Sequence, residues 1–227
     1  MRKYFLIFIA GLAIGGAVYF LARRSSGTAS KSLPSGMPPV VGDSMADLLH
    51  SLEIELQKHQ PDILASLQPG IEDRELERAE TLLGRSIHPE MKELYRWHNG
   101  LGSDKELFPG FGFFSLEDAI QTNQGLTRQY KEKGVDLMMA HEENWLTLFP
   151  DPAGDGYYYD PSRNYESGGV FYNFRESGSY RIFPSIRNLL KAVLECFQAG
   201  AYPPDSEPDF ALEEQIMDQY DLAVEGQ

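Results

Sequence analysis

The sequence predicts an α+β fold: helices first, then a small, mostly antiparallel sheet, then helices packed on it, with one transmembrane helix ahead of the domain. Three observations carry this prediction. Apolar residues recur at helical spacing in the early segments 43–59, 73–83 and 89–98. Short aromatic and β-branched runs, separated by turn residues, follow between 145 and 183. A long uncharged stretch lies near the N-terminus.

The uncharged stretch runs from Tyr4 to Ala22, 19 residues with basic side chains on both flanks. As a helix rising ~1.5 Å per residue it would span roughly 28 Å, close to the thickness of a bilayer core. A cleaved signal peptide is the alternative, but its apolar region is usually shorter and ends at a small-residue site. We therefore predict an uncleaved single-pass membrane anchor over residues 1–24. Because its basic flanks are nearly balanced, charge gives no orientation.

Residues 25–42 are rich in Ser, Gly and Pro, which favours an extended linker. A globular domain is expected over 43–202, opening with three helices. The first carries a stripe of leucines at helical spacing, the second ends before Gly84, and the third opens with Pro89 and closes at Asn99-Gly100.

In the middle of the chain, helical spacing of apolar residues gives way to short aromatic runs separated by turn residues. Residues 107–114 are aromatic and punctuated by glycine, which predicts a strand entering a turn. Ser115 followed by Asp118 resembles a capping box for a helix that runs to about residue 132. Strands are predicted at 145–149, 156–159, 169–174 and 179–183, with a hairpin turn at 176–179.

An amphipathic helix is predicted from residue 185 to Ala199, and Cys196, the one cysteine, reads as a small core residue of this helix. Residues 203–227 hold eight acidic side chains and no basic one. They form either a terminal helix over 209–224 or a solvated acidic tail.

The charge is concentrated on the soluble part. Residues 1–31 contain five of the 20 Lys and Arg and no acid, so residues 32–227 carry 15 basic and 34 acidic side chains, a net charge of −19. Such a domain repels nucleic acid and attracts a basic partner. Charge that serves only solubility is the plainer alternative.

No catalytic pattern is present. The histidines (His50, His59, His88, His98, His141) have no metal-ligand spacing, and no phosphate-binding loop or nucleophile motif occurs. His98 is placed to cap a helix, where a cation meets the helix dipole favourably. We therefore expect no enzyme activity, no cofactor and no metal.

The densest polar cluster joins Asp151, Asp155 and Asp160. Three carboxylates could bind calcium, but the spacing is not that of an EF-hand, and a turn with Asp155-Gly156 supplying its geometry is favoured. Tyr157 and Tyr159, with Trp145 nearby, suit a partner interface and suit a sheet core equally well.

The order of these signals resembles the SUKH superfamily, the group that contains the fungal cell-wall assembly regulator. The run from Glu80 through Leu83-Gly84, Ile87, Pro89 and Leu94-Tyr95 to Asn99-Gly100 is similar to the opening of that family. The segments 145–149, 154–160, 169–171 and 186–197 match its later strands and closing helix, so the resemblance covers roughly residues 65–202. Ile87, His88 and the membrane anchor depart from the usual pattern.

The resemblance implies a ligand-binding domain in a cytoplasmic setting, without known catalysis. Many bacterial members look like immunity proteins that neutralise toxins, and others suggest a scaffold or regulator of cell-envelope assembly. We therefore expect a membrane-anchored protein-binding module that binds a basic toxin domain. The residues predicted to form its partner-binding face are Asp151, Asp155, Asp160, Tyr157, Tyr159 and Trp145.

Overall fold

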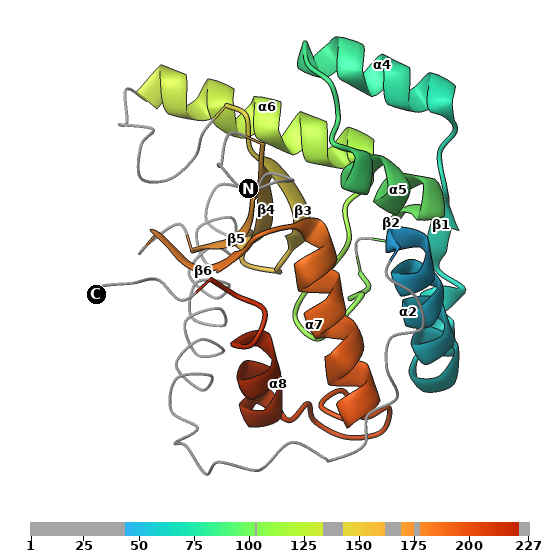
Figure 1. The fold of residues 1–227 in the computed structure, drawn as a ribbon. Helices are drawn as coiled ribbons and strands as arrows, with labels where there is room; N and C mark the ends of the chain where they lie inside the picture. The colour runs from blue at the N-terminus through green and yellow to red at the C-terminus, as the bar shows by residue number, and fades with distance from the viewer. Residues whose placement is uncertain (1–43, 103, 134–142, 162–168, 175–177, 223–227) are drawn as a thin grey trace, which may run out of the picture.

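The computed structural model describes residues 44–102, 104–133, 143–161, 169–174 and 178–222. Within them, helices and an antiparallel sheet form one packed body, as the predicted α+β class requires (Figure 1). Helix α7 lies between the sheet and α2 and contacts both. The predicted linker and the predicted transmembrane helix fall outside the described residues. Among the helices that are described, none is both long and apolar enough to cross a bilayer.

The first helix, α2 (Met45–His59), confirms the predicted leucine stripe. Ser44 caps its N-terminus, because the side-chain hydroxyl accepts a hydrogen bond from the backbone N–H of Asp47. The apolar side chains at helical spacing are all buried: Met45, Leu48, Leu49, Leu52 and Leu56. Pro61 does not only stop the helix; it opens a single further turn, α3 (Pro61–Leu64).

Helices α4 (Asp73–Leu83) and α5 (Pro89–Trp97) also form where they were predicted. Gly84 ends α4 in the left-handed conformation, with φ of 66°. His98 is not the last residue of α5 but its extended C-cap, and its ring Nδ1 lies 2.8 Å from the carbonyl oxygen of Gln68.

A small sheet pairs β1 (Leu67–Pro69) with β2 (His98–Leu101), and neither strand was predicted. Gly100 has φ of 90°, and a Cβ there would lie 2.5 Å from the backbone nitrogen of Ser115. The Asn99-Gly100 pair therefore serves a close approach of two backbone segments as well as the end of α5.

Residues 107–114 do not form the predicted strand. The segment turns on itself through a single bridge between Phe108 and Phe111. It then joins the two sheets, because Leu101 donates to the Phe113 carbonyl at 2.8 Å and Phe114 donates to the Leu148 carbonyl at 3.0 Å. Its aromatic side chains enter the core, which is why the sequence looked strand-like.

Helix α6 (Leu116–Lys133) begins at the predicted cap. The Ser115 hydroxyl accepts from the Asp118 backbone at 3.1 Å, and the Asn99 side chain accepts from the Leu116 backbone at 3.0 Å. The helix contacts α4 and β3, so it lies against the outer strand of the main sheet.

The main sheet confirms the predicted strands almost residue for residue, in the order β3-β4-β5-β6 with antiparallel neighbours. The strands are β3 (Leu146–Pro150), β4 (Gly156–Asp160), β5 (Gly169–Phe174) and β6 (Gly178–Phe183). One face joins the main core, and the other carries a second aromatic cluster of Trp145, Tyr158 and Phe171. Burial of both faces explains why the strands are apolar in continuous runs.

Helix α7 (Ile186–Ala199) is capped by Ser185, and its predicted inner face, with Cys196, is fully buried. Helix α8 (Phe210–Met217) packs on α7 and buries Ile216 and Met217. Of the two alternatives for the acidic C-terminal region, the docked helix is therefore the one observed over these residues.

Candidate functional site

The acidic segment after β3 is a structural turn held by its own carboxylate. Asp151 accepts a hydrogen bond from the backbone N–H of Asp155 at 2.9 Å, and its second carboxylate oxygen accepts from the Tyr172 hydroxyl at 3.0 Å. Gly156 completes the turn with φ of 146°, in a place where a Cβ would lie 2.3 Å from the Phe149 carbonyl oxygen. The turn interpretation is therefore confirmed, and Asp151 is already engaged.

The aromatic residues predicted beside this turn belong to the sheet core. Tyr157 and Tyr159 are 1% and 2% exposed and face the main core, whereas Trp145, 6% exposed, packs edge-on against Phe171 in the second cluster. Burial raises the pKa of Tyr159 to about 12, and the nearby positive charge of Arg85 opposes this shift. Of the two interpretations of these aromatics, the core is the one observed.

Most of the predicted partner face is buried in the domain. Asp155 and Asp160 are 7% and 4% exposed, so five of the six proposed residues present little or no side chain to a partner. Asp151, half-buried, is the remaining one. The six residues lie on β4 and on the segments that flank β3, and five of them are buried in the domain. The consecutive tyrosines of β4 cover both faces of a buried strand.

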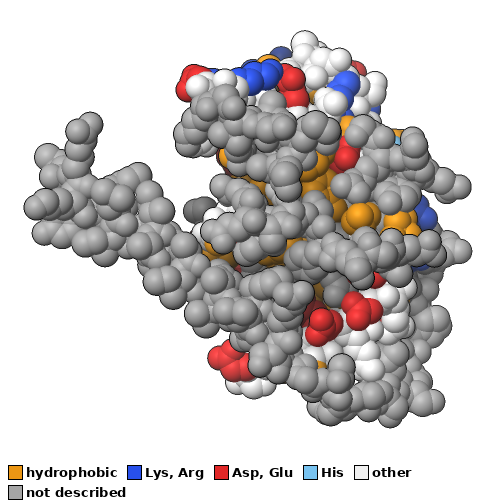
Figure 2. Space-filling model, turned by 90° about the vertical axis from the view of Figure 1, so that its left-hand side faces the viewer, with side chains coloured by type: hydrophobic (Ala, Val, Ile, Leu, Met, Phe, Trp, Pro, Cys, Tyr) orange, Lys and Arg blue, Asp and Glu red, His pale blue; other side chains and the backbone are white. Residues whose placement is uncertain are grey.

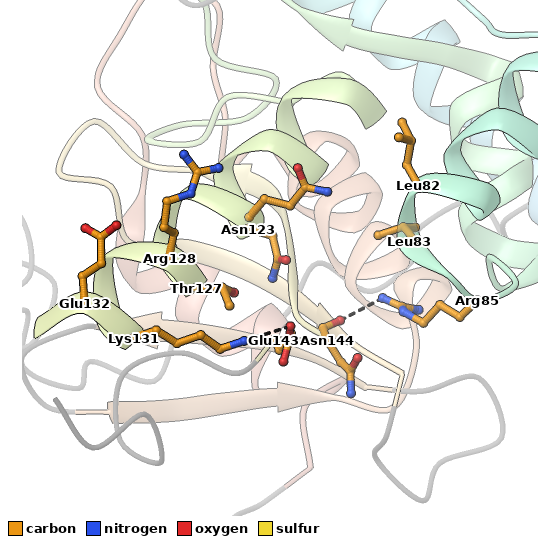
Figure 3. A pocket seen from close by; sticks show the side chains of 11 residues that line it. Leu82, Leu83, Arg85, Asn123, Thr127, Arg128, Lys131, Glu132, Glu143 and Asn144 are labelled. Carbon is orange, nitrogen blue, oxygen red and sulfur yellow. Dashed lines mark hydrogen bonds and ion pairs between the residues drawn. The ribbon is translucent and has the colours of Figure 1, made fainter. Parts of the chain in front are cut away.

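A surface groove lies elsewhere, between the end of α4, the second half of α6 and the residues ahead of β3 (Figure 3). Its volume is about 670 Å³. Leu82 and Leu83 come from α4, Arg85 from the loop after it, and Arg128 and Lys131 from α6. Sequence reasoning missed this site, because its parts are far apart along the chain and carry no motif.

Two polar contacts join residues that line the groove. Arg85 reaches across to donate to the Asn144 carbonyl at 2.8 Å, and Lys131 extends along the groove to Glu143 at 3.2 Å (Figure 3). Partial burial lowers the pKa of the Arg85 guanidinium from its ordinary value, and the nearby Tyr159 and Asp160 oppose that shift. Arg128 is exposed and has no ion-pair partner among the described residues.

The floor of the groove is fixed by α6. The buried Asn123 side chain donates to the backbone carbonyl of Trp145, which ties α6 to the residue ahead of β3. Thr127, one turn later, is also buried. Helix α6 is therefore held against the sheet, and α4 contacts α6 in turn.

A second surface, around α8, is acidic. Figure 2 shows a few acidic side chains between the parts of this face that are drawn in grey. The described residues 203–222 hold seven acids and no Lys or Arg. The exposed ones are Asp205, Glu207, Glu214 and Asp218.

Among the described residues no group of three or more His, Cys, Asp or Glu side chains could hold a metal ion. Cys196 is a buried free thiol in the core, as predicted. His98 stands beside Trp97 and the Gln68 carbonyl, in a structural position.

The fold and these surfaces define a small α+β domain with a polar groove at one side and an acidic helix at another. A family model places it further: the SMI1 / KNR4 family (SUKH-1) matches residues 70–192, more than half of the chain. The chain belongs to this family. The match confirms the resemblance drawn from the sequence, and it spans α4 to α7 and so includes the groove. No curated protein matches the chain.

Proposed function

We propose that this protein is a membrane-anchored, non-catalytic binding module of the immunity type, which neutralises a basic toxin domain by binding it. Family membership supports a SUKH domain in such a role. The observation that carries the proposal is the charge: residues 32–227 bear −19, and exposed carboxylates gather around α8.

The physical argument concerns association. An acidic surface attracts a basic toxin from a distance and raises the rate of encounter, and it can cover a basic cleft once bound. The Debye length is about 8 Å at physiological ionic strength, so salt screens the attraction of exposed carboxylates such as Asp205, Glu207 and Glu214 beyond about that distance. This attraction is therefore strongest at low salt and weakens as the salt concentration rises. Binding should therefore be fast at low salt and slower at high salt.

The test uses the full-length chain and a basic toxin domain encoded by a neighbouring gene. We expect nanomolar binding that weakens with salt, and protection of cells that produce both proteins. Replacing Asp205, Glu207 and Glu214 with their amides should slow association about tenfold or more.

The matched control removes three exposed acids elsewhere, Glu77, Asp104 and Glu117. These three amide replacements remove the same amount of negative charge, so they should slow association less if the α8 surface is the binding face. Equal effects from both triple variants would place the binding face elsewhere, and failure to protect against every neighbouring toxin would reject the immunity role.

A scaffold or regulator of envelope assembly is the second candidate, and the predicted anchor at residues 1–24 favours it, because an anchored domain stays at the envelope. Protease treatment of intact cells stripped of outer barriers separates the settings. A protected domain faces the cytoplasm, as expected for capture of a cytoplasmic toxin. A digested domain lies outside the membrane, which favours envelope assembly.

A further inference from the structure

The groove between α4 and α6 reverses the charge of the molecule locally. Three cationic side chains line it, Arg85, Arg128 and Lys131, against two acidic ones, Glu132 and Glu143. The soluble chain around it carries 34 acids and 15 bases. An excess of positive charge in a concave site attracts anionic groups more strongly than the same charge on a flat surface.

The three cationic side chains differ in whether they already have a hydrogen-bond or ion-pair partner. Arg85 donates a hydrogen bond to the Asn144 carbonyl. Lys131 forms an ion pair with Glu143, and the side chains of Lys131 and Glu143 are more than half exposed. Arg128 is exposed and has no ion-pair partner among the described residues. Its guanidinium can therefore bind a carboxylate through two parallel hydrogen bonds without breaking an existing contact.

The groove also presents apolar surface beside these cations. The Leu82 side chain is 63% exposed, although large apolar residues of the described chain are otherwise mostly buried. Leu83 lies beside it and is only partly buried. An occupant that covered Leu82 would remove apolar area from water, which is favourable at about 25 cal/mol per Å².

We propose that this groove binds an extended acidic segment of a partner protein, with a carboxylate on Arg128 and an apolar side chain on Leu82. A polypeptide fits better than a nucleic acid, because it can place an apolar side chain on the exposed Leu82 next to its carboxylate, whereas a nucleic acid carries a charge at every phosphate. The proposal is independent of the toxin-binding role, which uses the acidic surface around α8.

The binding test uses the full-length chain in a non-ionic detergent and a fluorescein-labelled ten-residue peptide of alternating Glu and Leu. Two peptides serve as comparisons, one with Lys for every Glu and one with Ser for every Leu. Fluorescence anisotropy should give micromolar binding of the Glu/Leu peptide, weaker binding of the Glu/Ser peptide and none of the Lys/Leu peptide. Binding of the Lys/Leu peptide as tight as that of the Glu/Leu peptide would overturn the proposal.

Substitutions then locate the binding. Arg128→Glu should weaken the Glu/Leu peptide about tenfold or more, because it replaces an attraction with a repulsion. Leu82→Ser should weaken it about tenfold, through loss of the apolar contact. The matched control is Arg74→Glu, which reverses the same charge as Arg128→Glu. Arg74 is exposed, lies about two turns before Leu82 on α4 and is outside the groove. This control should leave affinity within about twofold, since long-range charge effects are screened.

Both groove residues are exposed, so thermal unfolding should be nearly unchanged in the variants, and a loss of binding then reports the groove. Peptide affinity that is equal in wild type, Arg128→Glu and Leu82→Ser would overturn the proposal. An unlabelled single-stranded oligonucleotide provides the remaining contrast. If it displaces the peptide at lower concentration than unlabelled peptide does, the groove binds nucleic acid instead and the proposal is wrong.

Discussion

Glu80 on α4 and Lys92 on α5 form an ion pair at 2.6 Å, and the same Glu80 oxygen accepts a hydrogen bond from the backbone of Ile87 at 2.8 Å. One carboxylate therefore holds both helices and the loop between them. The Lys92 contact and the backbone bond lower the pKa of Glu80 from its ordinary value. These three positions lie in the run that resembled the SUKH opening, which gives that pattern a structural reason.

Replacing Glu80 with Gln should lower the melting temperature at pH 7. Because the pKa of Glu80 is depressed in the folded state, its stabilising contribution is present above about pH 4.5 and is lost as pH falls through the lower, folded pKa. The difference in melting temperature between wild type and Glu80→Gln should therefore shrink below pH 4.5. Glu77→Gln, at an exposed position on the same helix, is the control and should change the melting temperature at pH 7 much less than Glu80→Gln does.

Gly156→Ala should be strongly destabilising, by about 3 kcal/mol or more, since φ of 146° disfavours a side chain and the new Cβ would collide with the Phe149 carbonyl. Urea unfolding measures the change. Gly125→Ala is the control, because Gly125 lies in α6 with nothing within 4 Å of an added Cβ. It should stabilise by roughly 0.5–1 kcal/mol. A mild effect at Gly156 would show that the turn can relax.

Asp151→Ala should cost about 2–3 kcal/mol of unfolding free energy, because it leaves the Asp155 backbone N–H and the Tyr172 hydroxyl without their shared acceptor. Tyr172→Phe removes only one of these two hydrogen bonds and should cost less. Chemical denaturation of both variants checks the order. If Asp151→Ala were as stable as wild type, the carboxylate would be available for a partner after all.

Ile216→Ala should destabilise the domain by about 2–5 kcal/mol, because Ile216 is fully buried where α8 packs on α7. Ala211→Ser, on the exposed side of the same helix, should stay within about 0.5 kcal/mol of wild type. Thermal unfolding of the two variants distinguishes a docked helix from a dispensable acidic tail, since a dispensable tail would tolerate both changes.

Local patterns predicted the helices well and their surfaces less well. In α4, Leu76, Ala79 and Leu83 fall on one side of a 3.6-residue helix, whereas Leu82 lies about 120° from Leu76. The structure accordingly exposes Leu82, although its side chain is apolar. A stricter reading of helical angle would have marked this residue as available for binding.

The small sheet and the groove could not be predicted, for one physical reason. Strand β1 is three residues long and pairs Leu67 with Leu101, so its signal depends on a contact 34 positions away. The groove likewise assembles residues from α4, from α6 and from the segment ahead of β3. The acidic turn was predictable because its hydrogen bonds are local, but burial of Tyr157 and Tyr159 was not, because three consecutive tyrosines fit an exposed surface and a two-sided core equally.

The position of α7 between α2 and the sheet also sets when this protein can fold during synthesis. The apolar faces of α2, β5 and β6 are covered by a helix that begins at Ile186, far along the chain. Until that helix leaves the ribosome, those faces have no partner, and non-local contacts of this kind form slowly. The domain therefore completes its core only after α7 has been synthesised, long after the predicted N-terminal anchor. Exposed apolar faces of this kind favour aggregation of the newly made chain until α7 covers them.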